Sequence, residues 1–170
     1  MTVRLLSTAL FLTAALLLTG CGDDTPLAPS SMDDLRTIFT AEEAEIEGDV
    51  DEAVVRLIGL QFTNSTSVTV SDDSRDILAK FAQVYELFPD HDYTVEAHTD
   101  SRGSSAYNLQ FSTSRAQAVL EQLMEAAGRP TGGSMGAEGF GEERPIDNNA
   151  TANGRARNRR VEVVLRRASE

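Results

Sequence analysis

The chain contains a single cysteine, Cys21, and only two histidines, His91 and His98, in 170 residues. One cysteine excludes an intramolecular disulfide, and there is no pair of cysteines to hold a structural zinc ion. The HExxH and GxSxG signatures of zinc proteases and serine hydrolases are also absent. His98 lies two residues before Asp100, on the same face of a strand, and we interpret it as a structural histidine. The sequence therefore predicts a protein that is not an enzyme and that uses no metal or cofactor.

Long hydrophobic runs are also missing, except near the N-terminus. Residues 5–18 form an apolar run that is short for a membrane span but typical of a signal peptide. Residues 18–21 read LTGC, which resembles the lipobox of bacterial lipoproteins; an ordinary signal peptide with an incidental cysteine is the alternative. We predict that residues 1–20 are a lipoprotein signal peptide and that Cys21 carries acyl chains such as palmitate, which bind lipid. By the same resemblance, Gly22 in place of aspartate implies sorting to the outer membrane.

Basic residues are few compared with acidic ones, 15 against 27, for a net charge of −12. The excess lies in residues 22–52, where eleven acidic residues and one basic residue give −10. Such an acidic protein is a poor partner for nucleic acid. Residues 22–32 are rich in Asp, Pro and Ser, and we predict an acidic flexible tether over residues 21–44. Residues 33–47 have the spacing of a short helix that packs on the domain or recognises a partner, but we favour a partly ordered spacer.

Residues 45–170 carry the alternating patterns of one globular domain. The predicted strands are residues 54–62, 93–98, 134–140 and 160–166, and the predicted helices are residues 72–88 and 105–127. Gly136 and Gly139 weaken the third of these strands. The order β-α-β-α-β-β predicts a two-layer α/β domain of the α+β type, with the helices packed on a mixed sheet.

Two strings within this domain are distinctive. Residues 98–120 read HTDSRGSSAYNLQFSTSRAQAVL, and residues 151–165 read TANGRARNRRVEVVL. The HTD step, the YN turn, the SxxRA helix and the GRARNRRVE tail resemble, in order, those of the OmpA-like domain. The resemblance extends over roughly residues 45–168. The family that it points to includes the peptidoglycan-associated lipoprotein. The resemblance implies an OmpA-like fold that faces the periplasm and binds peptidoglycan in the Gram-negative envelope.

The resemblance also implies which charges bind the ligand. Asp100, at the end of a strand, and Arg115, on the following helix, match the two ligand-binding charges of the family. The free end of diaminopimelate, in the stem peptide of peptidoglycan, has one ammonium and one carboxylate on the same carbon. A fixed carboxylate and a fixed guanidinium suit such a zwitterion, because charge-assisted hydrogen bonds are strong. We expect Asp100 to bind the amine and Arg115 to bind the carboxylate.

Five further residues are predicted to belong to this peptidoglycan-binding site. Asn108 lies two turns before the arginine on the same helical face, where it binds either the ligand or the backbone. Thr99 and Leu109 flank the site, and Phe62 forms a wall. Arg159 resembles a second arginine of the family, for which we favour a structural role.

Together these features predict an outer-membrane lipoprotein that binds diaminopimelate and tethers the outer membrane to the cell wall. The alternative is an envelope lipoprotein that docks periplasmic protein partners, as the resemblance to the peptidoglycan-associated lipoprotein implies. One departure from the family pattern is Asn64, which stands where the family often has an acidic residue. It does not affect Asp100 or Arg115.

Overall fold

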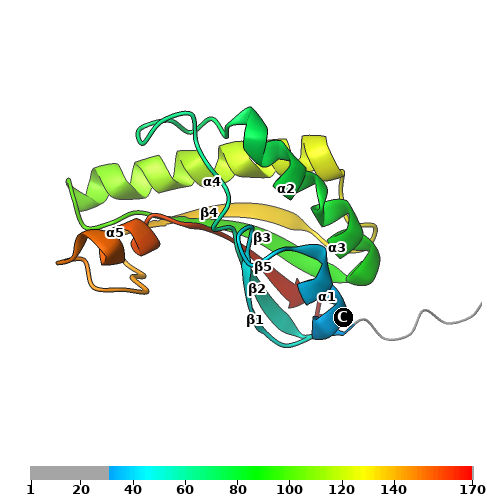
Figure 1. The fold of residues 1–170 in the computed structure, drawn as a ribbon. Helices are drawn as coiled ribbons and strands as arrows, with labels where there is room; N and C mark the ends of the chain where they lie inside the picture. The colour runs from blue at the N-terminus through cyan, green and yellow to red at the C-terminus, as the bar shows by residue number, and fades with distance from the viewer. Residues whose placement is uncertain (1–30, 170) are drawn as a thin grey trace, which may run out of the picture.

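The chain folds around a five-stranded sheet, which the computed structural model describes within residues 31–169 (Figure 1). In chain order the elements are α1 (Met32–Ile38), β1 (Glu45–Gly48), β2 (Glu52–Arg56), η1 (Asp72–Ser74), α2 (Arg75–Ala79), α3 (Phe81–Leu87), β3 (His91–His98), α4 (Ser105–Ala127), β4 (Met135–Gly141), α5 (Ala152–Asn158) and β5 (Val161–Arg167). The strand order is β1-β2-β5-β3-β4, with β3 and β4 parallel and the other neighbours antiparallel. The predicted α+β fold, with helices on a mixed sheet, is therefore confirmed.

The two faces of the sheet have different surroundings. Figure 1 shows α2, α3 and α4 over one face, with α5 at the end of the sheet beside the start of α4. The covered face carries apolar residues such as Val95 of β3 and its partner Val163 of β5, both fully buried. The next pair along, Glu96 and Glu162, points to the opposite face because side chains alternate along a strand. The sheet thus separates an apolar core from a polar face.

The longest of the described helices, α4, has the predicted bounds, residues 105–127. The Ser104 hydroxyl accepts a hydrogen bond from the Tyr107 amide at 3.3 Å and caps the N-terminus. Gly128, with φ of +80°, ends the helix. Because both ends are specified locally and one side of the helix is apolar, the sequence alone predicts this element well.

Two predicted elements have different bounds in the structure. The strand predicted at residues 54–62 is β2, which is shorter and pairs with the unpredicted strand β1. The helix predicted at residues 72–88 is divided into η1, α2 and α3, with a break at Lys80. Leu78 and Phe81 are both fully buried on either side of this break, so the apolar spacing continues through it and conceals it.

The helix α5 was not predicted. It begins after Thr151, whose hydroxyl accepts a hydrogen bond from the Gly154 amide at 2.9 Å. A threonine cap is a recognised start signal. The helix has only seven residues, and the arginine run within it hides the signal.

Residues 32–44 differ from the predicted tether because α1 packs on the domain. Ser31 and Asp34 form a capping box, in which the Ser31 hydroxyl accepts from the Asp34 amide at 3.1 Å and the Asp34 carboxylate accepts from the Ser31 amide at 3.2 Å. Leu35 is fully buried, and the Phe39 ring lies 5.4 Å from the Phe81 ring. The favoured spacer interpretation is wrong for α1, because its apolar side packs against a distant part of the chain.

The predicted signal peptide, Cys21 and the rest of the predicted tether lie outside the described residues. None of the helices between residues 31 and 169 combines the length and the apolar character needed to cross a membrane.

Candidate functional site

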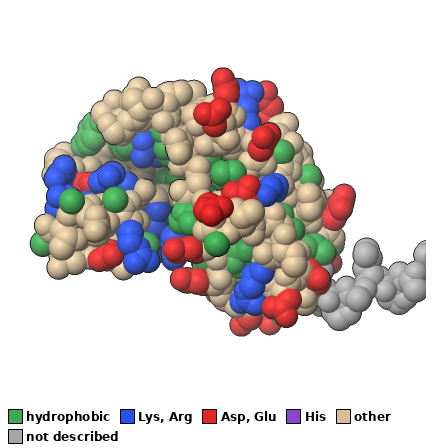
Figure 2. Space-filling view, viewed as in Figure 1, with side chains coloured by type: hydrophobic (Ala, Val, Ile, Leu, Met, Phe, Trp, Pro, Cys, Tyr) green, Lys and Arg blue, Asp and Glu red, His purple; other side chains and the backbone are tan. Residues whose placement is uncertain are grey.

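A cleft of about 650 Å³ lies between residues 57–65, which follow β2, and residues 156–161, where α5 leads into β5. Among residues 31–169, five arginines and a single acidic residue, Glu45, line it. Figure 2 shows basic side chains gathered around a hollow on this face, with acidic side chains mostly on the other half of the view. The excess of guanidinium groups favours an anionic ligand group.

Arg115 reaches the cleft from α4, and no acidic residue within residues 31–169 pairs with it. Its Nε donates to the Ser67 carbonyl at 3.2 Å, and its Nη2 donates to the carbonyls of Ser67 and Ser65 at 2.9 and 3.3 Å. Its Cζ lies 3.8 Å from the centre of the Phe62 ring and 4.5 Å from that of Phe111. Within the described part of the chain, its Nη1 has no hydrogen-bond partner and no carboxylate pairs with it.

The guanidinium of Arg115 is therefore largely buried, yet it lines a cleft that is open to a ligand. Burial, and then the nearby charge of Arg159, lower the pKa of Arg115 to about 10, so it stays a cation at neutral pH. Binding of an anion to a buried cation that lacks a counter-ion is favourable, because the anion replaces the hydration that the cation lost on burial. Arg115 is thus suited to bind a carboxylate.

Asp100 is paired with Arg159 rather than with Arg115. Its Oδ2 accepts from Arg159 Nη1 at 2.7 Å, and its Oδ1 accepts from the Arg102 amide at 2.9 Å. Burial alone would raise the pKa of Asp100, but these two hydrogen bonds outweigh it and hold the pKa below its ordinary value. Asp100 is therefore ionised at neutral pH. The ion pair with Asp100 fits the structural role that we favoured for Arg159. Arg159 also lines the cleft together with Arg115, where a ligand can reach it.

The other predicted site residues have different surroundings. Asn108 is buried, and its Nδ2 donates to the Asp100 carbonyl at 3.3 Å and to Glu142 Oε2 at 2.5 Å. It therefore holds the backbone of Asp100. The hydroxyl of Thr99 is buried and has no hydrogen-bond partner in the described part of the chain, and Leu109 is exposed on α4.

Of the seven predicted site residues, three line the cleft, namely Phe62, Arg115 and Arg159. The structure brings Asp100 to the cleft through Arg159, while Asn108, Thr99 and Leu109 do not line it. A role of these seven residues in peptidoglycan binding stays a prediction.

Sequence reasoning missed several features of the cleft. The carbonyls of Ser65 and Ser67 orient Arg115, but backbone groups leave no signal in residue identity. Arg157 also lines the cleft, although it was not among the predicted site residues. Ile58 and Ile146 lie at the cleft from segments far apart in the sequence.

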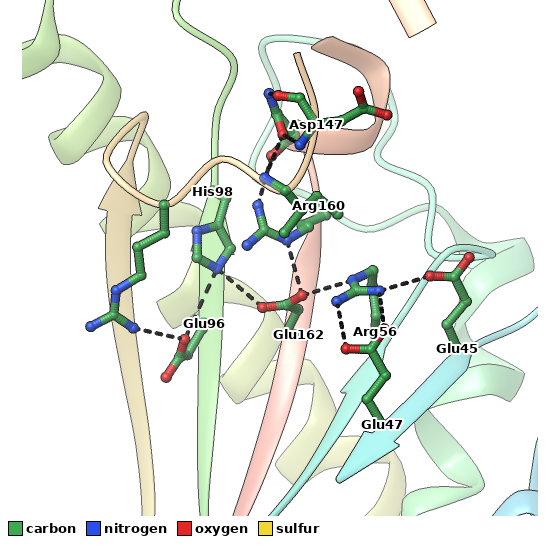
Figure 3. A network of polar contacts seen from close by, with 11 residues as sticks. Glu45, Glu47, Arg56, Glu96, His98, Asp147, Arg160 and Glu162 are labelled. Carbon is green, nitrogen blue, oxygen red and sulfur yellow. Dashed lines mark hydrogen bonds and ion pairs between the residues drawn. The ribbon is translucent and has the colours of Figure 1, made fainter. Parts of the chain in front are cut away.

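A network of ion pairs on the polar face of the sheet supports the cleft wall (Figure 3). Glu162 Oε1 accepts from Arg56 Nε at 2.8 Å and from Arg160 Nε at 2.9 Å. Arg56 Nη1 also donates to Glu45 Oε2 at 2.8 Å. These bonds fix the positions of Arg56 and Arg160, which both line the cleft. The buried carboxylate of Glu162 lies between them and pairs with both.

Glu96, His98 and Glu162 also lie close together, with one ligand atom from each within 4.8 Å of the others. Their carboxylates already face guanidinium groups, since Glu96 lies 3.4 Å from Arg144 Nη1 and Glu162 binds two arginines. The ring of His98 is buried and stacks on Phe140 at 5.4 Å, the environment of a structural histidine. This cluster is best described as an ion-pair network.

The network makes stability depend on pH. Burial alone would raise the pKa of Glu162, but the nearby His98 ring at 3.4 Å and hydrogen bonds from Arg160 and Arg56 lower it from 4.5 to about 2. Ionised Glu162 therefore stabilises the fold above pH 4.5, and this contribution, roughly 3 kcal/mol, is lost as the pH falls toward 2. Burial raises the pKa of Glu96, which opposes the trend in part.

We expect Glu162→Gln to flatten the fall in the free energy of unfolding between pH 5 and pH 2.5, measured by urea titration at several pH values. Glu47→Gln is the control, because Glu47 pairs with the same Arg56 but is mostly exposed. Equal slopes for wild type and Glu162→Gln would contradict the assignment.

The chain is similar to several known proteins. A model of the OmpA family matches residues 62–159. The chain is 30% identical to the outer-membrane lipoprotein YfiB of Pseudomonas aeruginosa, over 95% of this chain and 93% of that protein. It is 34% identical to the peptidoglycan-binding protein ArfA of Mycobacterium tuberculosis, over 69% of this chain. Among solved structures, the cell wall anchor of the T6SS from Pseudomonas aeruginosa matches with a TM-score of 0.63 and 31% identity, over 81% of this chain and 94% of that one.

Some of these relatives are longer proteins. The chain spans 36% of the length of ArfA and 27% of the length of outer membrane porin F of Pseudomonas aeruginosa. YfiB, in contrast, matches almost end to end. The family model covers more than half of the chain, which confirms both the predicted resemblance and the prediction of a non-enzymatic protein. The chain therefore belongs to the OmpA family.

Proposed function

We propose that this chain is an outer-membrane lipoprotein whose domain binds diaminopimelate of peptidoglycan without a covalent bond and so tethers the membrane to the cell wall. The observation that carries the proposal is the guanidinium of Arg115, which is buried at a cleft and has no counter-ion among the described residues. Asp100, which is ion-paired with Arg159 of the cleft lining, supplies the opposite charge. The name of ArfA and the description of the T6SS cell wall anchor support a cell-wall ligand.

The free end of diaminopimelate fits these charges. Its carboxylate binds the unoccupied Nη1 of Arg115, and its ammonium binds Asp100. A carboxylate has about four acceptor sites, so Asp100 accepts the ammonium while it retains the Arg102 amide. Asp100 is only 6% exposed, whereas the Arg159 side chain is 46% exposed. Arg159 therefore moves aside in part when the ammonium enters.

The N-terminal part of the chain supplies the other end of the tether. Acyl chains on Cys21 would anchor the protein, since each buried methylene contributes about 0.8 kcal/mol to membrane binding. The match to YfiB, named an outer-membrane lipoprotein, extends over almost the whole chain and supports this anchor. Many weak contacts between anchored copies and one polymer then give avidity.

Co-sedimentation with purified cell-wall sacculi tests this function. We expect the soluble fragment of residues 22–170 to pellet with sacculi that contain diaminopimelate. Sacculi in which lysine replaces diaminopimelate are the control, because lysine keeps the ammonium and lacks the carboxylate. Equal pelleting with both would contradict the role of Arg115. A fragment that stays in solution with both would point to a periplasmic protein as the ligand.

A further inference from the structure

The cleft has more lining groups than the end group of diaminopimelate requires. That end group uses Arg115, which packs on Phe62 in the lining, and Asp100, which is paired with Arg159 of the lining. The lining also includes Arg157 of α5 and the isoleucines at positions 58 and 146. These further residues have no task in binding a single zwitterionic group.

Arg157 presents a guanidinium that is almost free. Its side chain is 58% exposed, and its nearest acid, Asp147, lies 3.6 Å away. This distance is too long for a hydrogen bond, so the ion pair leaves the donors of Arg157 available. Arg155, on the same helix, instead donates to the carbonyls of Asn149 and Ala150 at 2.8 and 3.0 Å. The two arginines of α5 thus differ, and only Arg157 lines the cleft.

Arg159 has spare donors as well. A guanidinium carries five N–H donors in a planar fork, and within the described residues Arg159 uses its Nη1 on Asp100 alone. The one acidic residue of the lining, Glu45, already accepts from Arg56. Arg157 and Arg159 therefore face the cleft with open donors and no competing free carboxylate in its lining.

Apolar side chains stand at the same cleft. Ile58 is 45% exposed and Ile146 is 37% exposed, two of the four large hydrophobic side chains exposed in the described part of the chain. They come from the segment after β2 and from the segment before α5, respectively. An aliphatic segment of a ligand that covers these apolar side chains removes their surface from water, which favours binding.

We propose that Arg157 and Arg159 bind a second carboxylate of the same stem peptide, whose aliphatic segment covers Ile58 and Ile146. The ligand class is thus a peptide with one free ammonium and at least two free carboxylates. This inference rests on the proposed function. Two neighbours of diaminopimelate offer such a carboxylate, namely the α-carboxylate of a γ-linked glutamate before it and the terminal carboxylate of an alanine after it.

Calorimetric titration of the full mature chain with synthetic peptides tests the inference. The first peptide is N-acetyl-γ-D-glutamyl-diaminopimelate with the carboxylate of the acylated diaminopimelate centre amidated, and its counterpart has the glutamate α-carboxylate amidated as well. The second is diaminopimelyl-D-alanine acetylated on the nitrogen of the centre that is joined to alanine, and its counterpart has the alanine carboxylate amidated. We expect at least one acid to bind about tenfold more tightly than its amide, as for the loss of one hydrogen bond to a charged group. The pair that shows the difference identifies the source of the carboxylate.

Variants decide whether Arg157 is responsible. We expect Arg157→Gln to abolish the difference between acid and amide, while the amides bind as they do to wild type. Arg167→Gln is the control, because Arg167 is exposed, pairs with Asp51 and does not line the cleft. Equal affinity of wild type for each acid and its amide, or a difference that persists in Arg157→Gln, overturns this inference alone. No binding of any peptide overturns the proposed function together with it.

Discussion

Replacing Asp100 or Arg115 by alanine is expected to weaken binding of diaminopimelate peptides by about 1.5–3 kcal/mol each, the range for hydrogen bonds to charged groups. The double variant is expected to lose less binding free energy than the sum of the two single losses. Both charges bind one ligand, so removal of the first weakens the contact that the second makes. Calorimetry with a single peptide measures all three values. Strictly additive losses would argue against a shared pocket.

The surroundings of Arg115 require a second variant. Its Nε and Nη2 hold the carbonyls of Ser65 and Ser67, so alanine also releases the segment that carries Phe62. Arg115→Lys keeps the positive charge but removes the fork that bonds to two groups at once. We expect Arg115→Lys to retain the fold by circular dichroism and still to lose most of the affinity. An affinity equal to that of wild type would show that charge alone is enough.

Gly139→Ala is expected to destabilise the fold strongly, whereas Gly136→Ala on the same strand is expected to leave it unchanged or slightly more stable. A Cβ at Gly139 would lie 2.1 Å from the Thr113 amide nitrogen of α4, and the backbone cannot move aside cheaply. A Cβ at Gly136 meets nothing within 4 Å. Overpacking of this kind costs about 1–3 kcal/mol or more, while alanine in open space stabilises by up to about 1 kcal/mol.

Urea unfolding of both variants measures the difference, and peptide binding provides a second readout. Thr113 lies two residues before Arg115, so a displaced α4 also moves the guanidinium away from the cleft. We therefore expect Gly139→Ala to weaken binding as well, and Gly136→Ala to bind normally. Equal stability of the two variants would show that the close approach of β4 to α4 is not required.

The two glycines illustrate the limit of the sequence. Both weaken the predicted strand in the same way, and residue identity cannot distinguish the one that α4 touches from the one beside open space. The division of the helix predicted at residues 72–88 is hidden for a similar reason, since the apolar spacing is kept on both sides of Lys80.

The sequence by itself determined the elements whose signals are local. The bounds of α4 follow from Ser104 and Gly128, the strand β3 follows from alternation, and β5 follows from its run of β-branched residues. These features depend on backbone preferences and on residues within one or two turns of each other.

Only the tertiary structure decided which groups meet. It paired Asp100 with Arg159, 59 residues away, and it oriented Arg115 with backbone carbonyls about 50 residues earlier in the chain. It also packed α1 on α3, where the sequence favoured a partly ordered spacer. Such contacts join segments whose own patterns are compatible with several partners. Their free energy appears only once the sheet and helices have brought those segments together.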